Sequence, residues 1–340
     1  MNGQAAVETL WVGGKGGMES ALVARAGIPF RTIPAAGLHG VGPRNFPRNL
    51  GLMIQGVGAS RRILQEFKPA VMLFTGGYVA VPMALAGRRV PSLVYVPDIE
   101  PGLALKTVAR LAKRVAVSAE DSRRYFPAKA PVVVTGYPVR ASLGQQDRDG
   151  AQAALGLDPT LPTILVSGGS KGARSINMAV LQHLERLLDL AQIIHVSGEL
   201  DWPVVEERRR ALDATRAGRY HAYAYLHEQM PMALAAADLA VWRAGASSLG
   251  ELPMVGLPAL LVPYPYAWRY QKVNAEYLAR RGAALVLEDE RLPEELLPTV
   301  VSLLGNPEKL AAMRNSMHSL ARPDAAAAIA DQIRQLGGEH

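Results

Sequence analysis

The stretch Thr163-Ile-Leu-Val-Ser-Gly-Gly-Ser-Lys-Gly-Ala-Arg-Ser-Ile-Asn177 runs from an apolar strand through a glycine turn into a helix. Gly168, Gly169 and Gly172 let the backbone approach a ligand closely, because glycine carries no Cβ. The helix that follows offers unpaired N–H groups and the positive end of its dipole to a diphosphate. The stretch therefore predicts a phosphate-binding loop in an α/β sheet. The alternative is that the glycines serve only the geometry of a strand–helix turn.

A second segment repeats this plan and favours the binding interpretation. Asp238-Leu-Ala-Val-Trp-Arg-Ala-Gly-Ala-Ser-Ser-Leu-Gly-Glu-Leu252 reads as a strand, a loop of small residues and a helix start. A buried strand is expected within 256–265, and the polar residues Tyr270, Gln271 and Asn274 open another helix. Two helix N-termini at one sheet can bind one nucleotide, and the polar side chains beyond them can read a sugar.

Composition places the chain among ordinary folded proteins. Its 340 residues predict two domains, with 49% hydrophobic and 20% charged residues. The absence of cysteine excludes disulfides and thiolate metal ligands, which fits a reducing compartment. A net charge of +7 and a pI near 9.7 indicate an anionic partner, such as a nucleotide or an acidic membrane surface. Nucleic acid is the least favoured partner, because the basic residues are spread along the chain without an aromatic-rich basic patch.

The chain start lacks the basic and long apolar regions of a secretory signal, so none is expected. Residues 70–87 carry no charge over 18 positions, which touches the length of a membrane span. Gly76, Gly77 and Pro82 divide this run, so it predicts a buried strand, a glycine turn and a helix instead.

Strand-like and helix-like segments alternate along the whole chain, which predicts parallel α/β layers. The first series has strands at 8–13, 30–34, 71–74, 92–96, 115–118 and 132–135. The second begins at Thr163 and continues at 193–197, 220–225, 239–242, 259–262 and 284–287. A polar stretch, 144–150, separates them, and a domain boundary is therefore expected near residue 141.

Five motifs occur in an order that resembles the MurG family, the N-acetylglucosaminyltransferases that convert lipid I to lipid II in peptidoglycan synthesis. The resemblance covers nearly the whole chain, and its motifs are Gly76-Gly-Tyr-Val79, Gly136-Tyr-Pro-Val-Arg140, Gly168-Gly-Ser-Lys-Gly-Ala-Arg174, Ala244-Gly-Ala-Ser-Ser-Leu-Gly-Glu251, and Arg269-Tyr-Gln271 with Asn274. It implies the GT-B fold, in which two Rossmann-like domains face a cleft. Residues 1–141 would bind the lipid acceptor, with a C-terminal helix, 322–336, packed back on them, and 142–321 would bind UDP-GlcNAc.

The resemblance also implies an inverting transfer, in which a general base takes the proton of the acceptor hydroxyl. Neither a cofactor nor a metal is expected, because the glycine loop, its helix dipole, Lys171 and Arg174 would stabilise the departing diphosphate. The implied UDP-GlcNAc residues are Arg140, Gly168, Gly169, Ser170, Leu226, Ala246, Ser247, Glu251, Gln271 and Asn274, and the implied acceptor-side loop is Gly76, Gly77 and Tyr78.

Within this set, three positions leave alternatives open. Glu251 stands three residues after Ser248, as in a capping box, so it can cap a helix instead of binding the ribose. Tyr270 replaces a glutamine of many relatives, which leaves a related hexose open beside GlcNAc. Beside Leu226, whose backbone would hold the uracil, Tyr225 and His227 are interpreted as packing and surface groups.

Two departures from the family concern catalysis. The family's first strand and its Gly-Gly-x-Gly-Gly-His loop, whose histidine is a proposed base, have no counterpart, and Gly13-Gly-Lys-Gly-Gly17 follows the second strand. This leaves three alternatives: a truncated product, strands that re-pair across the gap, or a native start further upstream. The loop Tyr95-Val-Pro-Asp-Ile-Glu-Pro-Gly102 replaces the family's His-Glu-Gln-Asn, so Asp98 or Glu100 becomes the candidate base. Otherwise Asp98 caps a helix, or the prolines only shape a turn.

The lipid acceptor requires access to a membrane. The segment 44–64 mixes apolar and basic residues in a helical pattern, which suits peripheral docking on the anionic cytoplasmic face of the cell membrane. The alternative is a helix that packs its apolar side on the first domain. Three functions of different class follow: an active lipid I glycosyltransferase, a catalytically impaired remnant that binds nucleotide-sugar, and, least favoured, a UDP-sugar epimerase.

Overall fold

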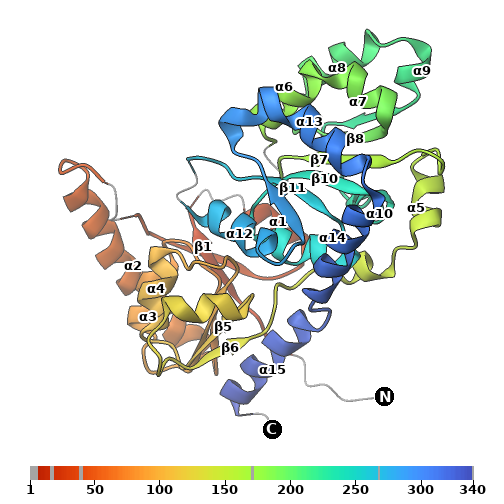
Figure 1. Ribbon diagram of the computed structural model, residues 1–340. Coiled ribbons are helices and arrows are strands. Elements are labelled where there is room, and N and C mark those ends of the chain that lie inside the picture. Colours follow the sequence, from red (N-terminus) through yellow and green to blue (C-terminus); the bar gives the residue numbers. More distant parts are fainter. Residues whose placement is uncertain (1–6, 16–18, 38–40, 170–171, 267–268, 339–340) are drawn as a thin grey trace.

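The computed structural model describes residues 7–15, 19–37, 41–169, 172–266 and 269–338. Its larger layer is a six-stranded parallel sheet in the order β12-β11-β10-β7-β8-β9 (Figure 1). The strands are β7 (Thr163–Ser167), β8 (Gln192–Val196), β9 (Tyr220–Tyr223), β10 (Leu239–Arg243), β11 (Ala259–Val262) and β12 (Ala284–Val286). Every residue of β7, β8, β10 and β11 is buried, as expected of parallel strands covered on both faces.

Helices cover both faces of this sheet. One face packs on α5 (Arg148–Ala154), α10 (Met230–Ala236), α11 (Glu251–Val255), α12 (Tyr270–Ala279) and α14 (Pro307–Ser319), through residues such as Leu234, Leu252 and Leu278. The other packs on α6 (Arg174–Gln182), α7 (Leu184–Leu190), α8 (Trp202–Arg210) and α13 (Leu292–Leu304), while α9 (Ala214–Ala217) lies beside α7. The short helices η3 (Ala246–Leu249) and η4 (Asp289–Arg291) complete this half.

The first half of the chain builds a four-stranded parallel sheet, β3-β4-β5-β6. Its strands are β3 (Met72–Phe74), β4 (Ser92–Val96), β5 (Arg114–Val117) and β6 (Val132–Val134), followed by η1 (Glu120–Tyr125) after β5 and η2 (Ala141–Gln145) after β6. One face packs on α2 (Phe46–Phe67), α3 (Ala80–Ala86) and α4 (Leu103–Ala109). The C-terminal helix, α15 (Ala325–Gly337), packs on the other face, where Ile329 contacts the cluster of Leu93, Tyr95 and Ala116.

A separate two-stranded sheet precedes these elements. β1 (Trp11–Gly14) and β2 (Phe30–Ile33) pair in parallel around α1 (Glu19–Arg25). Among the described residues, β1 pairs only with β2 and β3 only with β4, so the alternative of strands that re-pair across the gap is wrong. Side-chain packing joins the two sheets instead, because Ile33 is buried in the same cluster as Phe74 and Val94. The predicted boundary near residue 141 falls in the connection between β6 and β7.

Candidate active site

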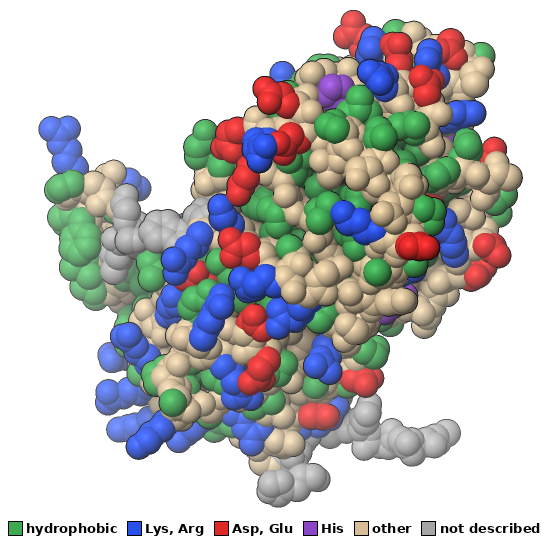
Figure 2. Space-filling model, viewed as in Figure 1, with side chains coloured by type: hydrophobic (Ala, Val, Ile, Leu, Met, Phe, Trp, Pro, Cys, Tyr) green, Lys and Arg blue, Asp and Glu red, His purple; other side chains and the backbone are tan. Residues whose placement is uncertain are grey.

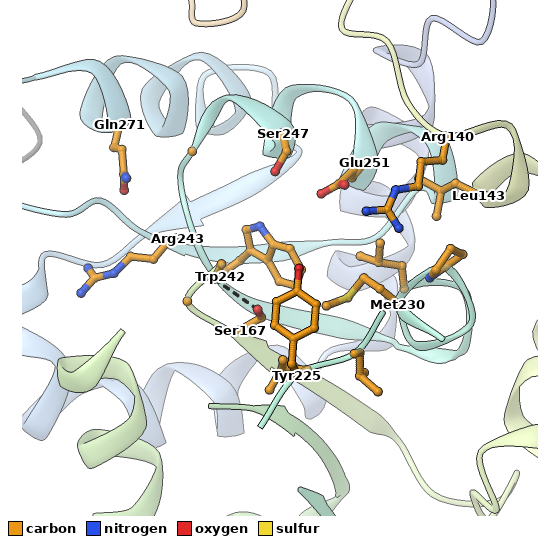
Figure 3. A pocket seen from close by; sticks show the side chains of 17 residues that line it. Arg140, Leu143, Ser167, Tyr225, Met230, Trp242, Arg243, Ser247, Glu251 and Gln271 are labelled. Carbon is orange, nitrogen blue, oxygen red and sulfur yellow. Dashed lines mark hydrogen bonds between the residues drawn. The ribbon is translucent and has the colours of Figure 1, made fainter. Parts of the chain in front are cut away.

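A cavity of about 440 Å³ opens at the carboxyl ends of β7, β9 and β10, where ligands bind in parallel α/β sheets (Figure 3). Its lining combines glycine backbone, carboxylate, guanidinium and aromatic groups. The predicted residues that line it are Arg140, Gly168, Gly169, Leu226, Ser247, Glu251 and Gln271. Ala246 and Asn274 do not line it, and Ser170 lies outside the described residues together with Lys171.

The glycine loop after β7 requires glycine at two positions for different reasons. Gly169 has φ +83°, and no atom lies within 4 Å of the place that a Cβ would occupy, so backbone conformation alone demands glycine there. Gly172 has φ +75°, and a Cβ there would lie 2.3 Å from the carbonyl oxygen of Ser197. Gly172 therefore packs directly against Ser197, just after β8, and Arg174 at the start of α6 pairs with Asp201 at 2.6 Å.

A buried polar network behind the loop fixes this arrangement. The amide of Asn177 on α6 donates to Ser197 O and Asp201 Oδ2, both at 2.8 Å. Its Oδ1 therefore accepts from Nε2 of His195 at 3.0 Å, which leaves His195 Nδ1 to accept from the Tyr220 hydroxyl at 2.7 Å. Burial lowers the pKa of His195 to about 4, so the ring is neutral at physiological pH. Helix α6, β8 and β9 are thus tied together directly beneath the glycine loop.

Glu251 and Arg140 lie close together at one end of the cavity and extend into it (Figure 3). Burial raises the pKa of the Glu251 carboxyl, while a hydrogen bond from Ser247 and the charge of Arg140 lower it. The capping-box alternative is wrong, because the Ser248 hydroxyl donates to Gly245 O at 2.6 Å and the N-cap of α11, Gly250, has no side-chain partner. The Glu251 carboxylate is available to accept hydrogen bonds from a ligand's hydroxyls.

Aromatic and apolar groups form the middle of the cavity. Tyr225, interpreted from the sequence as a packing or surface group, lines the cavity with 39% of its surface exposed, whereas Leu226 is buried at 4%. The His227 ring packs against Tyr225 at a tilt of 52°, with ring centres 4.5 Å apart, and the His227 carbonyl accepts from Arg140 at 3.4 Å. Trp242 and Met230 also line this region. A flat base or sugar ring finds apolar contact area here.

Arg243, which the sequence analysis did not single out, lines the cavity at the end opposite Arg140 (Figure 3). It is 7% exposed and donates to Ser175 Oγ at 2.6 Å while pairing with Asp289. A guanidinium at the end of a buried strand needs such partners. The only signal in the sequence was an arginine that ends the apolar run of β10. Its charge is paired with Asp289 at the end where the glycine loop lies.

The polar residues at the start of α12 contact different parts of the molecule. Gln271 lines the cavity, and its Oε1 accepts from the backbone N–H of Tyr264 at 2.9 Å. Asn274, one helical turn further on, is completely buried and contacts the loop after β4 in the other half of the molecule. The two residues therefore serve different surfaces of the same helix start.

The loop after β4 carries both candidate bases, Asp98 and Glu100, but places them in different environments. Glu100 is 2% exposed, and its carboxylate receives Arg269 at 2.6 and 2.9 Å and Lys106 at 3.2 Å. Hydrogen bonds from Arg269, together with Lys106, hold the pKa of Glu100 below its usual range. Asp98 is only half-buried, and burial raises its pKa, although a hydrogen bond from Asn274 lowers it. It caps no helix, since α4 has Gly102 as its N-cap without side-chain help.

The acceptor-side loop follows β3. Gly76 and Gly77 have φ of +128° and +78°, and Tyr78 exposes 62% of its surface. His39, which the resemblance to the family places toward the acceptor side, lies outside the described residues. No helix in the described part of the chain is long and apolar enough to cross a membrane.

Comparisons with known proteins agree with this architecture. Residues 163–329 match the glycosyltransferase family 28 C-terminal domain, and residues 2–117 match the family 28 N-terminal domain. The chain is 45% identical to the "UDP-N-acetylglucosamine--N-acetylmuramyl-(pentapeptide) pyrophosphoryl-undecaprenol N-acetylglucosamine transferase" of Roseiflexus sp. (strain RS-1), over 96% of this chain and 83% of that protein. It is 37% identical to the protein of the same description from Desulforudis audaxviator (strain MP104C), over 98% and 91%.

Solved structures show the same fold. The crystal structure of Acinetobacter baumannii MurG has a TM-score of 0.75 at 26% identity, covering 96% of this chain and 90% of that one. The UDP-GlcNAc 2-epimerase from Neisseria meningitidis, bound to UDP-GlcNAc, has a TM-score of 0.62 at 14% identity, covering 96% and 91%. The second likeness is one of fold alone and gives no support to the epimerase alternative.

Proposed function

The chain belongs to the MurG family within glycosyltransferase family 28 and is an N-acetylglucosaminyltransferase, and from this premise we propose that it transfers GlcNAc from UDP-GlcNAc to lipid I, giving lipid II. The observation that carries the proposal is the cavity itself, in which the glycine loop, the Glu251 carboxylate and an aromatic wall surround one volume of nucleotide-sugar size. The diphosphate lies at Gly168 and Gly169, the ribose hydroxyls at Glu251, and the uracil beside Leu226.

The same geometry supports an inverting reaction with Asp98 as general base. The acceptor hydroxyl forms a bond to the sugar carbon as the bond from that carbon to the UDP oxygen breaks, and Asp98 takes the hydroxyl proton. Burial raises the pKa of Asp98, as suits a base, and this side chain is half-buried, whereas the Glu100 carboxylate is almost completely buried and occupied by Arg269 and Lys106. The charge that grows on UDP meets the backbone N–H groups of the glycine loop and the start of α6. Metal independence remains a prediction.

Helix α2 supports docking to a membrane surface. Its exposed apolar residues are Phe46, Leu50 and Ile54, with 44%, 41% and 66% of their surfaces accessible. Arg44, Arg48, Arg61 and Arg62 are exposed on or next to the same helix. Figure 2 shows hydrophobic side chains along this projecting helix, with basic side chains at its tip. We place this surface on the anionic cytoplasmic face of the cell membrane, where α2 lies in the headgroup region.

The function is tested by incubating the purified chain with radiolabelled UDP-GlcNAc and a lipid I analogue, and by measuring donor binding and label in lipid. Transfer is expected, and Asp98→Asn should lower it about a hundredfold or more, the usual contribution of a general base. Asp324→Asn, an exposed carboxylate beside α15, is the matched control and should keep full activity. Donor binding without any transfer would instead support the remnant, and no donor binding would refute the proposal.

Docking is tested separately, by sedimentation with phosphatidylglycerol vesicles and with neutral phosphatidylcholine vesicles. Replacing Phe46, Leu50 and Ile54 by serine should abolish sedimentation with the anionic vesicles while leaving UDP binding unchanged. Equal sedimentation of the wild-type and triple-serine chains would contradict α2 as the docking surface.

A further inference from the structure

Helix α12 connects the two halves of the molecule by polar contacts at three points along its length. At its start, Arg269 donates two hydrogen bonds to Glu100. In its first turns, Asn274 contacts the loop after β4, and just beyond its end Arg281 pairs with Asp121 of η1. Figure 1 places α12 between the two large sheets. A single helix of the donor-binding half thus reaches the loops after β4 and β5.

The Asn274 contacts determine how its amide is oriented. Its Oδ1 accepts from the backbone N–H of Ile99 at 3.0 Å, while its Nδ2 donates to Asp98 Oδ1 at 2.8 Å and to Ala244 O at 3.1 Å. The side chain is completely buried, so these groups hold it in one position. Both N–H donors are engaged by protein acceptors, which does not fit a residue that reads sugar hydroxyls.

These contacts also relate Asp98 to the donor cavity. Ala244, whose carbonyl accepts from the same amide nitrogen, directly precedes Gly245 in the cavity wall. One buried amide group therefore links the carboxylate, on the acceptor side, to the wall of the donor site. Asp98 itself is half-buried, whereas Glu100 in the same loop is 2% exposed.

We propose that Asn274 is a positioning residue, which holds the Asp98 carboxylate in place against the donor cavity and does so only while the two halves of the molecule are in contact. The inference rests on the proposed function, in which Asp98 takes the acceptor proton. Asn274 comes from the donor-binding half and Asp98 from the other, so separation of the halves removes the hydrogen bond that orients the base. Catalytic competence is thereby coupled to closure of the cleft.

The groups around Asp98 determine in which direction its pKa should change when the hydrogen bond from Asn274 is removed. The Tyr95, Tyr137 and Tyr270 phenols face it, and Glu100 is held by its two cations. The hydrogen bond from Asn274 lowers the pKa of Asp98, so its removal raises that pKa further. In Asn274→Ala, the acidic limb of the pH–rate profile should therefore move to higher pH, which a merely structural loss would not cause.

The experiment compares the wild-type chain with Asn274→Ala, Asp98→Asn and the double variant, using UDP-GlcNAc and a lipid I analogue. Asn274→Ala should lower kcat about tenfold to a hundredfold through misplacement of the base, while donor affinity changes by less than about threefold. In the Asp98→Asn background, Asn274→Ala should have no further effect on kcat. Arg281→Gln, which breaks the contact at the other end of α12, controls for a loosened interface and should leave the acidic limb in place.

Each outcome has a distinct meaning. A large loss of UDP-GlcNAc affinity in Asn274→Ala would assign this residue to the sugar and overturn the inference. Multiplicative effects of the two substitutions would also overturn it, since they would show independent action. Full activity of Asp98→Asn would overturn the base assignment and the inference together but not the transferase function. A wild-type chain without transfer would refute the proposed function itself. Thermal melting of each variant establishes that it is folded.

Discussion

Replacing Gly172 by alanine should damage the donor site far more than one methyl group suggests. The residue has φ +75°, which costs a side chain about 1–2 kcal/mol. In addition, the new Cβ would lie 2.3 Å from the Ser197 carbonyl oxygen, a distance that real contacts do not show. That carbonyl accepts from Asn177, so it is held by the buried network and the glycine loop must move instead. We expect UDP affinity to fall at least tenfold, about 1.4 kcal/mol.

Gly169→Ala provides the matched control within the same loop. Its φ of +83° carries a similar backbone cost, but no atom lies within 4 Å of the added Cβ. Because Gly169 itself lines the donor cavity, the two variants are compared by urea denaturation, which should show that Gly172→Ala loses more unfolding free energy than Gly169→Ala. Equal losses in the two variants would refute the reasoning that contact with Ser197, rather than backbone conformation, requires glycine at 172.

Three further perturbations test other parts of the molecule. The neutral His195 takes up a proton on unfolding, since its pKa lies near 4 in the fold against 6.5 otherwise, so stability should fall by about 2 kcal/mol from pH 7 to pH 5. Urea titrations should find this loss in the wild type and not in His195→Gln. Glu251→Gln should weaken UDP binding about tenfold by removing a charged acceptor, yet barely change binding of 2′,3′-dideoxy-UDP; equal losses would argue against ribose contact. Ile329→Ala, at 8% exposure, should lower the free energy of unfolding by about 2 kcal/mol, and an unchanged value would mean that α15 contributes little to the first sheet.

The layers were predictable from the sequence because buried parallel strands occur in it as continuous runs of mainly apolar residues. The expected strands at 92–96 and 259–262 coincide with β4 and β11, which are uniformly buried runs of apolar residues. That Gly168, Gly169 and Glu251 lie at one site could also be predicted, because each belongs to a local motif, and all three line the cavity. The positions of Tyr225 and Arg243 in the cavity wall were not predicted, since proximity to the cavity depends on how separate strands align in the sheet. The contact of Asn274 with Asp98 joins positions 176 residues apart, and no local pattern encodes it.

The two-stranded sheet at the start of the described chain has a consequence for local stability. Its strands exchange backbone hydrogen bonds only with each other among the described residues, so β1 and β2 are joined to β3–β6 through side chains alone. Such a unit can open without breaking the hydrogen bonds of the neighbouring sheet. In deuterium-exchange mass spectrometry, peptides spanning β1 and β2 should take up label well before those from β4 and β5. Early exchange in the four residues of each strand would show that β1 and β2 open as a separate unit, before the rest of the acceptor-side layer unfolds.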